Sequence, residues 1–327
     1  MQNFLDPAIL FFVFGLLAGL VRSNLEIPPQ IARFLSLYLL MALGLKGGFA
    51  LHQSGLTMDV TVSLICAILL ATVVPIIGYK LLKRFLSGYD AAALSATYGS
   101  VSAVTFITAV QYLDNHHVTY GGHMAAAMAL MESPAIIMAV LLANMVRQKE
   151  KSPSSAAESN TSRHTPISRI LHESVTDGAQ LVLLGAMVIG IVTGQSGHDA
   201  MKPFAGDLFK GMLAFFLLDM GLNAARNMGG LKGQSPWLLA YGLLGPMTHA
   251  ALALGLCMLL SIPAGNGALL MVLAASASYI AVPAVVRHAI PEANPSLYIG
   301  MSLGLTFPFN ILIGIPIYLG AAQTLLK

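Results

Sequence analysis

The sequence predicts an all-α polytopic membrane protein with ten transmembrane helices, arranged as two inverted repeats of five. Three observations predict this fold class. Hydrophobic residues make up 56% of the 327 residues and charged residues only 9%, whereas soluble domains contain roughly 25% charged residues. Apolar segments of about 20 residues, the length that crosses a bilayer, recur along the chain. The two halves of the chain also share an ordered pattern of Gly, Tyr and Pro. Lipid is therefore the expected solvent.

Each expected span is mainly apolar and is bounded by polar, Gly or Pro residues. The first lacks a basic region before it and an A-x-A-like cleavage site after it, so we interpret it as a permanent span. The fourth and ninth are the richest in small polar residues. In chain order the spans are 5–22, 31–51, 59–82, 91–112, 120–146, 178–195, 206–226, 236–260, 267–289 and 296–324.

One long polar connection, residues 147–176, separates the two groups of five spans. It contains "RQKEKSPSSAAESNTSRHTP", and a segment so rich in Ser, Pro and charge cannot build a core. We therefore expect a first repeat at 1–146, a flexible cytoplasmic linker at 147–176 and a second repeat at 177–327.

The distribution of Lys and Arg predicts the orientation, because these residues are enriched in cytoplasmic loops. With both termini outside, thirteen of the seventeen fall on the inner side, three on the outer side and one, Lys46, inside a span. The inner ones are Arg22, Arg33, Lys80, Lys83, Arg84, Arg147, Lys149, Lys151, Arg163, Arg169, Arg226, Lys232 and Arg287. We therefore expect a multi-pass protein of the plasma (inner) membrane.

The two halves resemble each other at an offset of about 174–179 residues. Five spans per half is an odd number, so the second half must be inverted relative to the first. Inverted repeats are typical of transporters that bind their substrate near the bilayer midplane. The paired positions are Gly15 with Gly190, Gly19 with Gly194, Gly44 with Gly221, Tyr120 with Tyr298, Gly122 with Gly300, and Pro134 with Pro308.

Small polar residues interrupt the fourth and ninth spans at equivalent positions of the repeat. "ATYGSVSAVTF" (96–106) contains Gly and four small hydroxyl residues, and "SASYIAVP" (276–283) ends in a proline that weakens the helix. Unwinding at both places would bring helix N-termini, which attract anions, and free carbonyls, which bind Na+, to one point. The alternative is that small residues only allow close helix packing. We favour a site because both interruptions are equivalent.

These segments also carry a family resemblance. "GSVSAVTF" (99–106) and "AASASYIAVPAVVRHAIPEANPSLYIG" (274–300) resemble the corresponding segments of the cyanobacterial-type sodium-dependent bicarbonate transporters. "LGLKGG", "ESPAIIMAVLLAN" and "MGLNA" match as well. The resemblance implies a homotrimer in which a core domain with two crossed, broken helices slides as an elevator past a gate domain. It also implies a PII-like regulatory partner on the cytoplasmic side.

The resemblance places bicarbonate and Na+ between the breaks. Two places depart from the family: Tyr279 follows Ser278 where the family has aspartate, and Val282-Pro283-Ala284 stands where the family has Gly-Pro-Pro. Both bear on the substrate and the coupling ion but not on the fold. The anion site is expected at Gly99, Ser100, Val101, Ser102, Ala103, Ser278, Tyr279 and Ile280, with Ser276 and Ala277 in the same motif. The Na+ site is expected at Thr97, Ser102, Glu132, Asp219, Ser276 and Ser278.

Three charged residues lie deep inside expected spans, where charge is costly and usually functional or paired. Lys46 and Asp219 occupy related spans and could neutralise each other. Alternatively, Asp219 serves the cation in place of the missing aspartate. Glu132, just before Pro134, is expected to serve an ion site or to organise the core.

The predicted function is secondary transport of a small monovalent anion, bicarbonate above all, with Na+ as the coupling ion and no other cofactor. No Arg lies at the middle of a span to hold a dicarboxylate, no G-x-x-x-x-G-K-[ST] nucleotide loop is present, and nothing indicates nucleic acid as a partner. Coupling of another solute to Na+ or H+ is the alternative. The alternative outside the transporter class is a membrane receptor that regulates, or is regulated by, the PII-like protein. An enzyme is not expected, because Ser100 and Ser102 lack a recognisable base.

Overall fold

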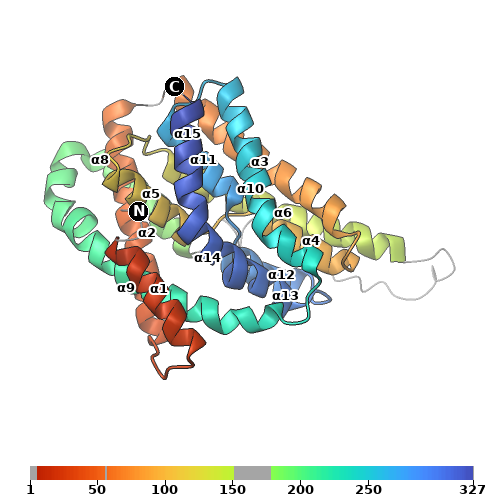
Figure 1. The fold of residues 1–327 in the computed structure, drawn as a ribbon. Coiled ribbons are helices and arrows are strands. Elements are labelled where there is room, and N and C mark those ends of the chain that lie inside the picture. The colour runs from red at the N-terminus through yellow and green to blue at the C-terminus, as the bar shows by residue number, and fades with distance from the viewer. Residues whose placement is uncertain (1–5, 56, 151–177, 327) are drawn as a thin grey trace.

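The computed structural model describes residues 6–55, 57–150 and 178–326, and these ranges contain helices, turns and loops but no strand. Figure 1 shows the arrangement of the helices. The first half of the chain comprises α1 (Pro7–Leu20), α2 (Pro29–Ser54), α3 (Met58–Leu82), α4 (Gly88–Gly99), α5 (Ala103–Asn115) and α6 (Met124–Glu150).

The second half of the chain has a more irregular backbone, with π-helical and 3₁₀ turns between its α-helices. It comprises α8 (Gly178–Lys202), a π-helical turn (Pro203–Asp207), α9 (Leu208–Asn227), a 3₁₀ turn (Met228–Leu231), α10 (Pro236–Leu259), α11 (Ala264–Ala275) and α12 (Ala281–Ala289). The C-terminal helix is built from α13 (Pro295–Ile299), α14 (Phe307–Phe309) and α15 (Ile315–Leu325), joined by π-helical turns at Gly300–Thr306 and Asn310–Gly314.

The prediction of an all-helical membrane protein is confirmed. Within the described residues, 7 helical segments are long and apolar enough to cross a membrane, one of them a 54-residue stretch, Gly178–Leu231, that contains both α8 and α9. α1 and α11 are apolar but shorter. α6 continues to Glu150, beyond the predicted start of the linker at 147. The rest of that linker lies outside the described residues.

Local sequence explains where several helices begin. Asp6 accepts a hydrogen bond from the Ala8 amide at 2.8 Å and Pro7 opens α1, while Ser87 accepts one from the Asp90 amide at 3.0 Å at the start of α4. Such side-chain oxygens satisfy amides that have no partner in the first turn, and proline suits the first position. These helix starts are therefore fixed by short-range chemistry.

Helices α1, α2, α8 and α9 gather on one side of the molecule, to the left in Figure 1. α1 packs closely against α9, and α2 packs against α8. Glycines permit both contacts: an added Cβ at Gly15 would lie 2.2 Å from the Leu218 carbonyl oxygen, and one at Gly48 would lie 2.2 Å from that of Met187. Because real Cβ atoms do not approach so closely, glycine is required at both crossings.

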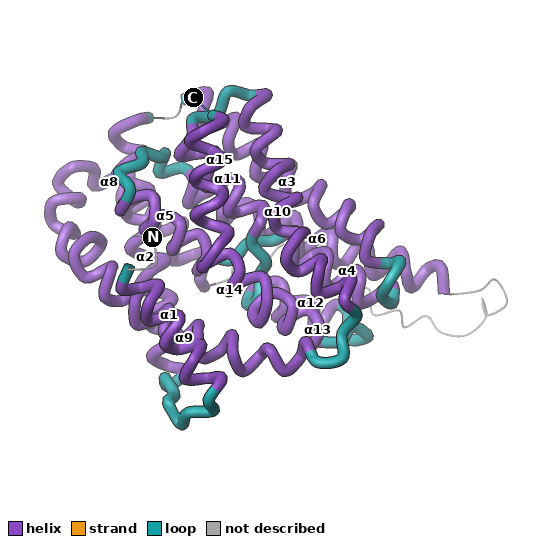
Figure 2. The backbone as a smooth tube through the Cα atoms, in the orientation of Figure 1, coloured by secondary structure: helices purple, strands orange, loops and turns teal. Residues whose placement is uncertain are grey.

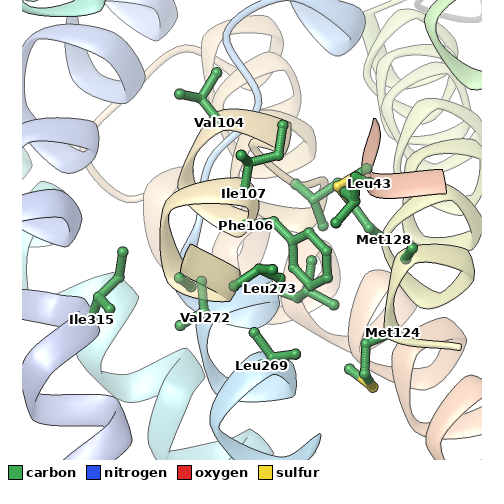
Figure 3. Packing of buried hydrophobic residues seen from close by; sticks show 14 of the residues in the cluster. Leu43, Val104, Phe106, Ile107, Met124, Met128, Leu269, Val272, Leu273 and Ile315 are labelled. Carbon is green, nitrogen blue, oxygen red and sulfur yellow. The ribbon is translucent and has the colours of Figure 1, made fainter. Parts of the chain in front are cut away.

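The other side of the molecule contains α3, α4, α6, α10, α11 and α12, to the right and centre in Figure 1. α5 lies between the two groups of helices. Its Phe106 is fully buried, and Figure 3 shows it among Leu43 of α2, Met128 of α6 and Leu273 of α11. The same residues belong to one continuous apolar cluster. This packing fixes the position of α5, and with it the non-helical link between α4 and α5.

An ion pair fastens the loop between α12 and α13 to the end of α6. The guanidinium of Arg147 donates from Nε to Oε1 of Glu292 at 3.0 Å and from Nη2 to Oε2 at 2.8 Å, and it also bonds the Ala289 carbonyl at 2.8 Å. The loop is held from its other end by Asp90, whose side chain accepts from the Asn294 amide at 2.8 Å. This explains the role of the polar residues in "IPEANP".

We expect thermal stability to decline as the pH is lowered toward 4, and Glu292→Gln to flatten that decline. The hydrogen bonds from Arg147 hold the pKa of Glu292 below its ordinary value. A depressed pKa stabilises the fold above the unfolded-state pKa, and the effect is lost as the pH falls through the folded-state value. Because the ion pair is partly exposed, Glu292→Gln should lower the free energy of unfolding at neutral pH by less than about 1 kcal/mol. Melting temperatures between pH 7 and pH 4 measure it; parallel curves for both proteins would contradict it.

Candidate functional site

The predicted interruption of the fourth span is present as a break between α4 and α5. The backbone leaves the helix at Ser100 (φ −95°, ψ −173°) and re-enters it after Ser102 (φ −104°, ψ 110°). Pro75 of α3 packs directly on the end of α4, where an added Cβ at Gly99 would lie 2.0 Å from its Cγ. Glycine at this position is thus explained by a close helix contact.

The ninth span is broken at the equivalent place. α11 ends at Ala275, Ser276 is extended (φ −79°, ψ 163°), and α12 begins at Ala281. Figure 2 shows the non-helical links near the centre of the molecule, surrounded by helices. The predicted serines at 100, 102, 276 and 278 therefore lie in the non-helical links. Pro283, predicted to break the ninth span, instead lies within the first turn of α12, where proline is tolerated.

Two hydrogen bonds join the breaks directly. The Ser102 amide donates to the Ser276 hydroxyl oxygen at 3.0 Å, and the Ser278 amide donates to the Thr97 carbonyl at 2.8 Å. Each break thus satisfies a backbone amide of the other, as the burial of these polar groups requires. The contact brings the two predicted motifs to a single site.

A serine hydroxyl accepts a hydrogen bond from the first turn of the helix that follows each break. Ser102 is the N-cap residue of α5, and Ser278 lies two residues before Ile280, the N-cap residue of α12. The Ser102 hydroxyl accepts from the Thr105 amide at 3.2 Å and from the Thr105 hydroxyl at 2.9 Å. The Ser278 hydroxyl accepts from the Val282 amide at 3.2 Å. The N-termini of α5 and α12, with their positive dipole ends and remaining first-turn amides, consequently meet at the same place.

A cavity of about 200 Å³ opens beside these two N-termini. Seven predicted site residues line it: Val101, Ser102, Ala103, Glu132, Ser278, Tyr279 and Ile280. The opposite wall comes from α2 and α8, through Ser36, Leu40, Ala179 and Gln180. The site therefore lies between the group of helices that carries the breaks and the group formed by α1, α2, α8 and α9.

The other predicted residues lie near the cavity without lining it. Thr97 uses its hydroxyl within its own helix, donating to Ala93 at 2.9 Å, and Ser276 does the same toward Leu273 at 2.9 Å. The Ser100 hydroxyl oxygen is buried and has no hydrogen-bond partner among the described residues. Gly99, Ala277 and Asp219 are buried behind the surface of the cavity.

Tyr279 takes a defined position at the cavity. Its ring packs edge-on against Phe307 with the centroids 5.3 Å apart, and its hydroxyl approaches the Met220 sulfur at 3.7 Å. The same hydroxyl lies beside that of Ser102 and close enough to Asp219 to interact with its charge. Asp219 itself accepts a hydrogen bond from Asn223 at 3.1 Å. The tyrosine thus stands between the helix break and the carboxylate on α9.

The charged residues predicted to lie deep in the membrane do not form the pair that was predicted for two of them. Lys46 pairs with Asp114, at 3.4 Å between Nζ and Oδ2, and lies over the ring of Phe209. The pairing of Lys46 with Asp219 is therefore wrong, because the tertiary fold brings the end of α5 next to α2. Glu132 accepts a hydrogen bond from Gln180, which joins α6 to α8 at the cavity wall.

Sequence reasoning missed the wall contributed by α2 and α8. Gln180 is a polar residue at the start of an apolar segment, and this could have singled it out. Ser36 and Leu40 carry no comparable signal, since nothing in the local sequence shows which face of α2 turns toward the breaks. Only the packing of α2 against the helices that carry the breaks places Ser36 and Leu40 at the cavity.

The charge of the cavity limits what it can hold. No Lys, Arg or His is found among the described residues that line it, and Glu132 is its only carboxylate. No group of three or more His, Cys, Asp or Glu that could hold a metal ion occurs among the described residues. Amides and hydroxyls suit a small monovalent anion, while hydroxyl, carbonyl and carboxylate oxygens suit a hard monovalent cation.

Comparison with known proteins gives one family. The family model described as the Na+-dependent bicarbonate transporter superfamily matches residues 7–323. A search of curated proteins finds no match.

Proposed function

This chain belongs to the Na+-dependent bicarbonate transporter superfamily, and on that premise we propose that it imports bicarbonate by symport with Na+. As a member of that family it is a transport protein and not an enzyme. The single observation that carries the proposal is the cavity where two helix N-termini meet, each with a first-turn amide bonded to a serine hydroxyl, and where no described lining residue is cationic. Bicarbonate is a planar monovalent anion with both acceptor oxygens and a hydroxyl donor, so it matches a site of amides and serine hydroxyls.

The anion is held in this proposal by the first turns of α5 and α12. The amides of Ala103 and Ala281, both at the cavity, are among those that a helix leaves without an internal partner. Ser102 and Ser278 orient the two turns, and the positive ends of both helices favour one negative charge. A dicarboxylate would need more positive charge than this, which supports a monovalent substrate.

The cation is held in this proposal on the α4 side of the break. The Ser100 hydroxyl is buried and has no hydrogen-bond partner in the described structure, so its oxygen is free to coordinate a cation. Asp219 supplies negative charge behind Tyr279, in the region where the family has an aspartate of its own. Oxygen ligands of this kind are those that broken helices offer to Na+ in transporters.

The architecture we propose is ten spans in two inverted repeats, with elevator motion of a core domain past a gate domain. Two features support it. The contacts of α1 with α9 and of α2 with α8 are related by exchange of the repeats, with glycines at the crossings in both pairs. Each break also donates one backbone amide hydrogen bond to the other broken span, from Ser102 to the Ser276 hydroxyl and from Ser278 to the Thr97 carbonyl. The cavity, which has one wall on each helix group, lies where such sliding would alternate its access.

We further propose that both termini are outside and that 147–176 is cytoplasmic, as the positive residues predict. In that orientation the cavity, which reaches the first residues of α8 at Ala179 and Gln180, opens toward the cytoplasm. The family resemblance extends the proposal to a homotrimer and a PII-like partner, for which Lys80, Lys83 and Arg84 supply a basic cytoplasmic surface.

Radiolabelled bicarbonate uptake into proteoliposomes tests the proposed function. We expect uptake to require an inward Na+ gradient and to stop when K+ replaces Na+. Asp219→Asn is expected to raise the Na+ concentration needed for half-maximal uptake at least about tenfold. The change removes a negative charge that contributes ~1.4 kcal/mol or more to binding of the cation. Uptake driven equally by a proton gradient would favour H+ coupling. The absence of bicarbonate uptake by a well-folded protein would exclude the substrate.

A further inference from the structure

A second cavity, of about 140 Å³, lies between α2, α5 and the start of α6. We call it the outer pocket, because it lies along the second half of α2, which the proposed orientation places toward the outside. One face of α2 lines both cavities: Ser36 and Leu40 line the cavity at the helix breaks, and Leu43, Gly47 and Ala50 line the outer pocket. Spacings of three and four residues keep these positions on one side of the helix. The outer pocket therefore continues the path that begins at the breaks.

Two buried apolar residues separate the two cavities. Leu43 of α2 and Phe106 of α5 belong to one apolar cluster, and Figure 3 shows them close together. Both line the outer pocket, and neither lines the cavity at the breaks. On α5, Phe106 follows Val104 at the cavity at the breaks and precedes Val110 at the outer pocket. The path is thus closed at this level in the described structure.

An ion pair crosses the boundary beside the outer pocket. Lys46 of α2 lies over the ring of Phe209 of α9, with Nζ 4.5 Å from the ring centroid, and its Nζ is 3.4 Å from Oδ2 of Asp114 at the end of α5. The other carboxylate oxygen of Asp114 accepts from the Tyr120 hydroxyl at 2.9 Å. Lys46 and Tyr120 both line the outer pocket. The ion pair thus joins α2 to α5, the helix that follows one of the breaks.

Asn115, the next residue of α5, makes two further contacts of this kind. Its amide nitrogen donates to Oδ2 of Asp6, the N-cap residue of α1, at 2.7 Å, and its amide oxygen accepts from Nζ of Lys210 on α9 at 3.1 Å. Gln111, one turn earlier on α5, donates to the same oxygen at 2.8 Å and so holds the side chain in place. The last turn of α5 is therefore bonded to α1, α2 and α9, all of them in the group that faces the breaks.

We propose that these contacts form a latch, with Asp6, Lys46 and Lys210 on one side and Asp114 and Asn115 on the other. The latch keeps the outer pocket closed while the cavity at the breaks is open toward the cytoplasm, and the site reaches the outer pocket when the latch opens. This inference rests on the proposed function, in which one helix group slides past the other. Lys46 and Asp114 are 29% and 34% exposed, and partly exposed ion pairs are weak, as a contact broken in every transport cycle must be.

External labelling of single cysteines in cells that express the chain tests the latch. The probe is a membrane-impermeant maleimide, and the main reporter is Ile280→Cys at the cavity at the breaks. In the proposed orientation this position faces the cytoplasmic side, so the probe reaches it from outside only when the site has moved to the outer pocket. Lys46→Gln is expected to speed this labelling about two- to fivefold, the shift that loss of a partly exposed ion pair produces. Asn115→Ala, which leaves every charge in place, should act in the same direction.

Lys202→Gln is the matched control. It makes the same change at an exposed lysine at the end of α8, which takes no part in the latch, and it should leave the labelling rate unchanged. Lys46→Arg retains the positive charge and should stay close to the wild type. The native thiols, Cys66 and Cys257, are buried, so the chain without an engineered cysteine gives the background. Rates are normalised to the amount of protein at the cell surface.

Two results would overturn the latch alone. In the first, Lys46→Gln speeds labelling of Val110→Cys in the outer pocket but not of Ile280→Cys, which is local loosening of the outer end. In the second, Na+ changes the labelling of Ile280→Cys, as sliding requires, but Lys46→Gln and Asn115→Ala do not. External labelling of Ile280→Cys that occurs in no variant and under no condition would overturn the sliding and the latch together. Labelling requires no uptake of bicarbonate, so a different transported substrate would leave this test unchanged.

Discussion

Bicarbonate uptake by a Ser102→Ala/Ser278→Ala double variant is expected to fall about a hundredfold, because each change removes ~1.4 kcal/mol of cap and ligand hydrogen bonding. Ser102 caps α5 through the Thr105 amide, and the Ser278 hydroxyl accepts from the Val282 amide in the first turn of α12. Without these hydroxyls both helix N-termini lose the geometry that presents their amides to the cavity. Initial rates of radiolabelled uptake in proteoliposomes measure the effect, and each single variant should show roughly a tenfold loss.

Ser63→Ala is the matched control for this prediction. Ser63 is a buried serine on α3 whose hydroxyl has no partner in the described structure, and it does not line the cavity. Its replacement should leave uptake unchanged. If the double variant transports as fast as Ser63→Ala while reconstituting equally well, the anion does not bind between the two helix breaks.

Gly44→Ala is expected to destabilise the protein by about 2–3 kcal/mol, the cost of forcing extra volume into a tight contact. A Cβ at Gly44 would lie 2.3 Å from the Leu183 carbonyl oxygen and 2.9 Å from the Ala186 Cβ, so α2 and α8 would have to separate. This separation would also shift the α2–α8 wall of the cavity. Loss of the monodisperse fraction on heating in detergent measures it.

Gly185→Ala provides the control on the facing helix. An added Cβ there meets nothing within 4 Å, so the substitution should be neutral or stabilise the helix by up to about 1 kcal/mol through the higher helix propensity of alanine. Equal melting temperatures for Gly44→Ala and Gly185→Ala would show that the α2–α8 contact can relax without cost.

The sequence alone determined the features that depend on neighbours along the chain. Composition and segment length predicted an all-helical membrane protein, because lipid requires every backbone polar group to be satisfied within helices. The position of both helix breaks was predictable as well. Gly, Ser and Pro change local helix stability wherever they occur, and the structure interrupts the helices at Ser100–Ser102 and at 276–280.

Only the tertiary structure decided which distant residues meet. It joined Ser102 to Ser276 and placed Gln180 beside Glu132. It also gave Lys46 the partner Asp114 and not Asp219. A helix presents a different face every residue or two, so spacing cannot tell which face turns to a neighbour. The crossings of α2 with α8 and of α1 with α9, set by glycines at the contacts, made that choice.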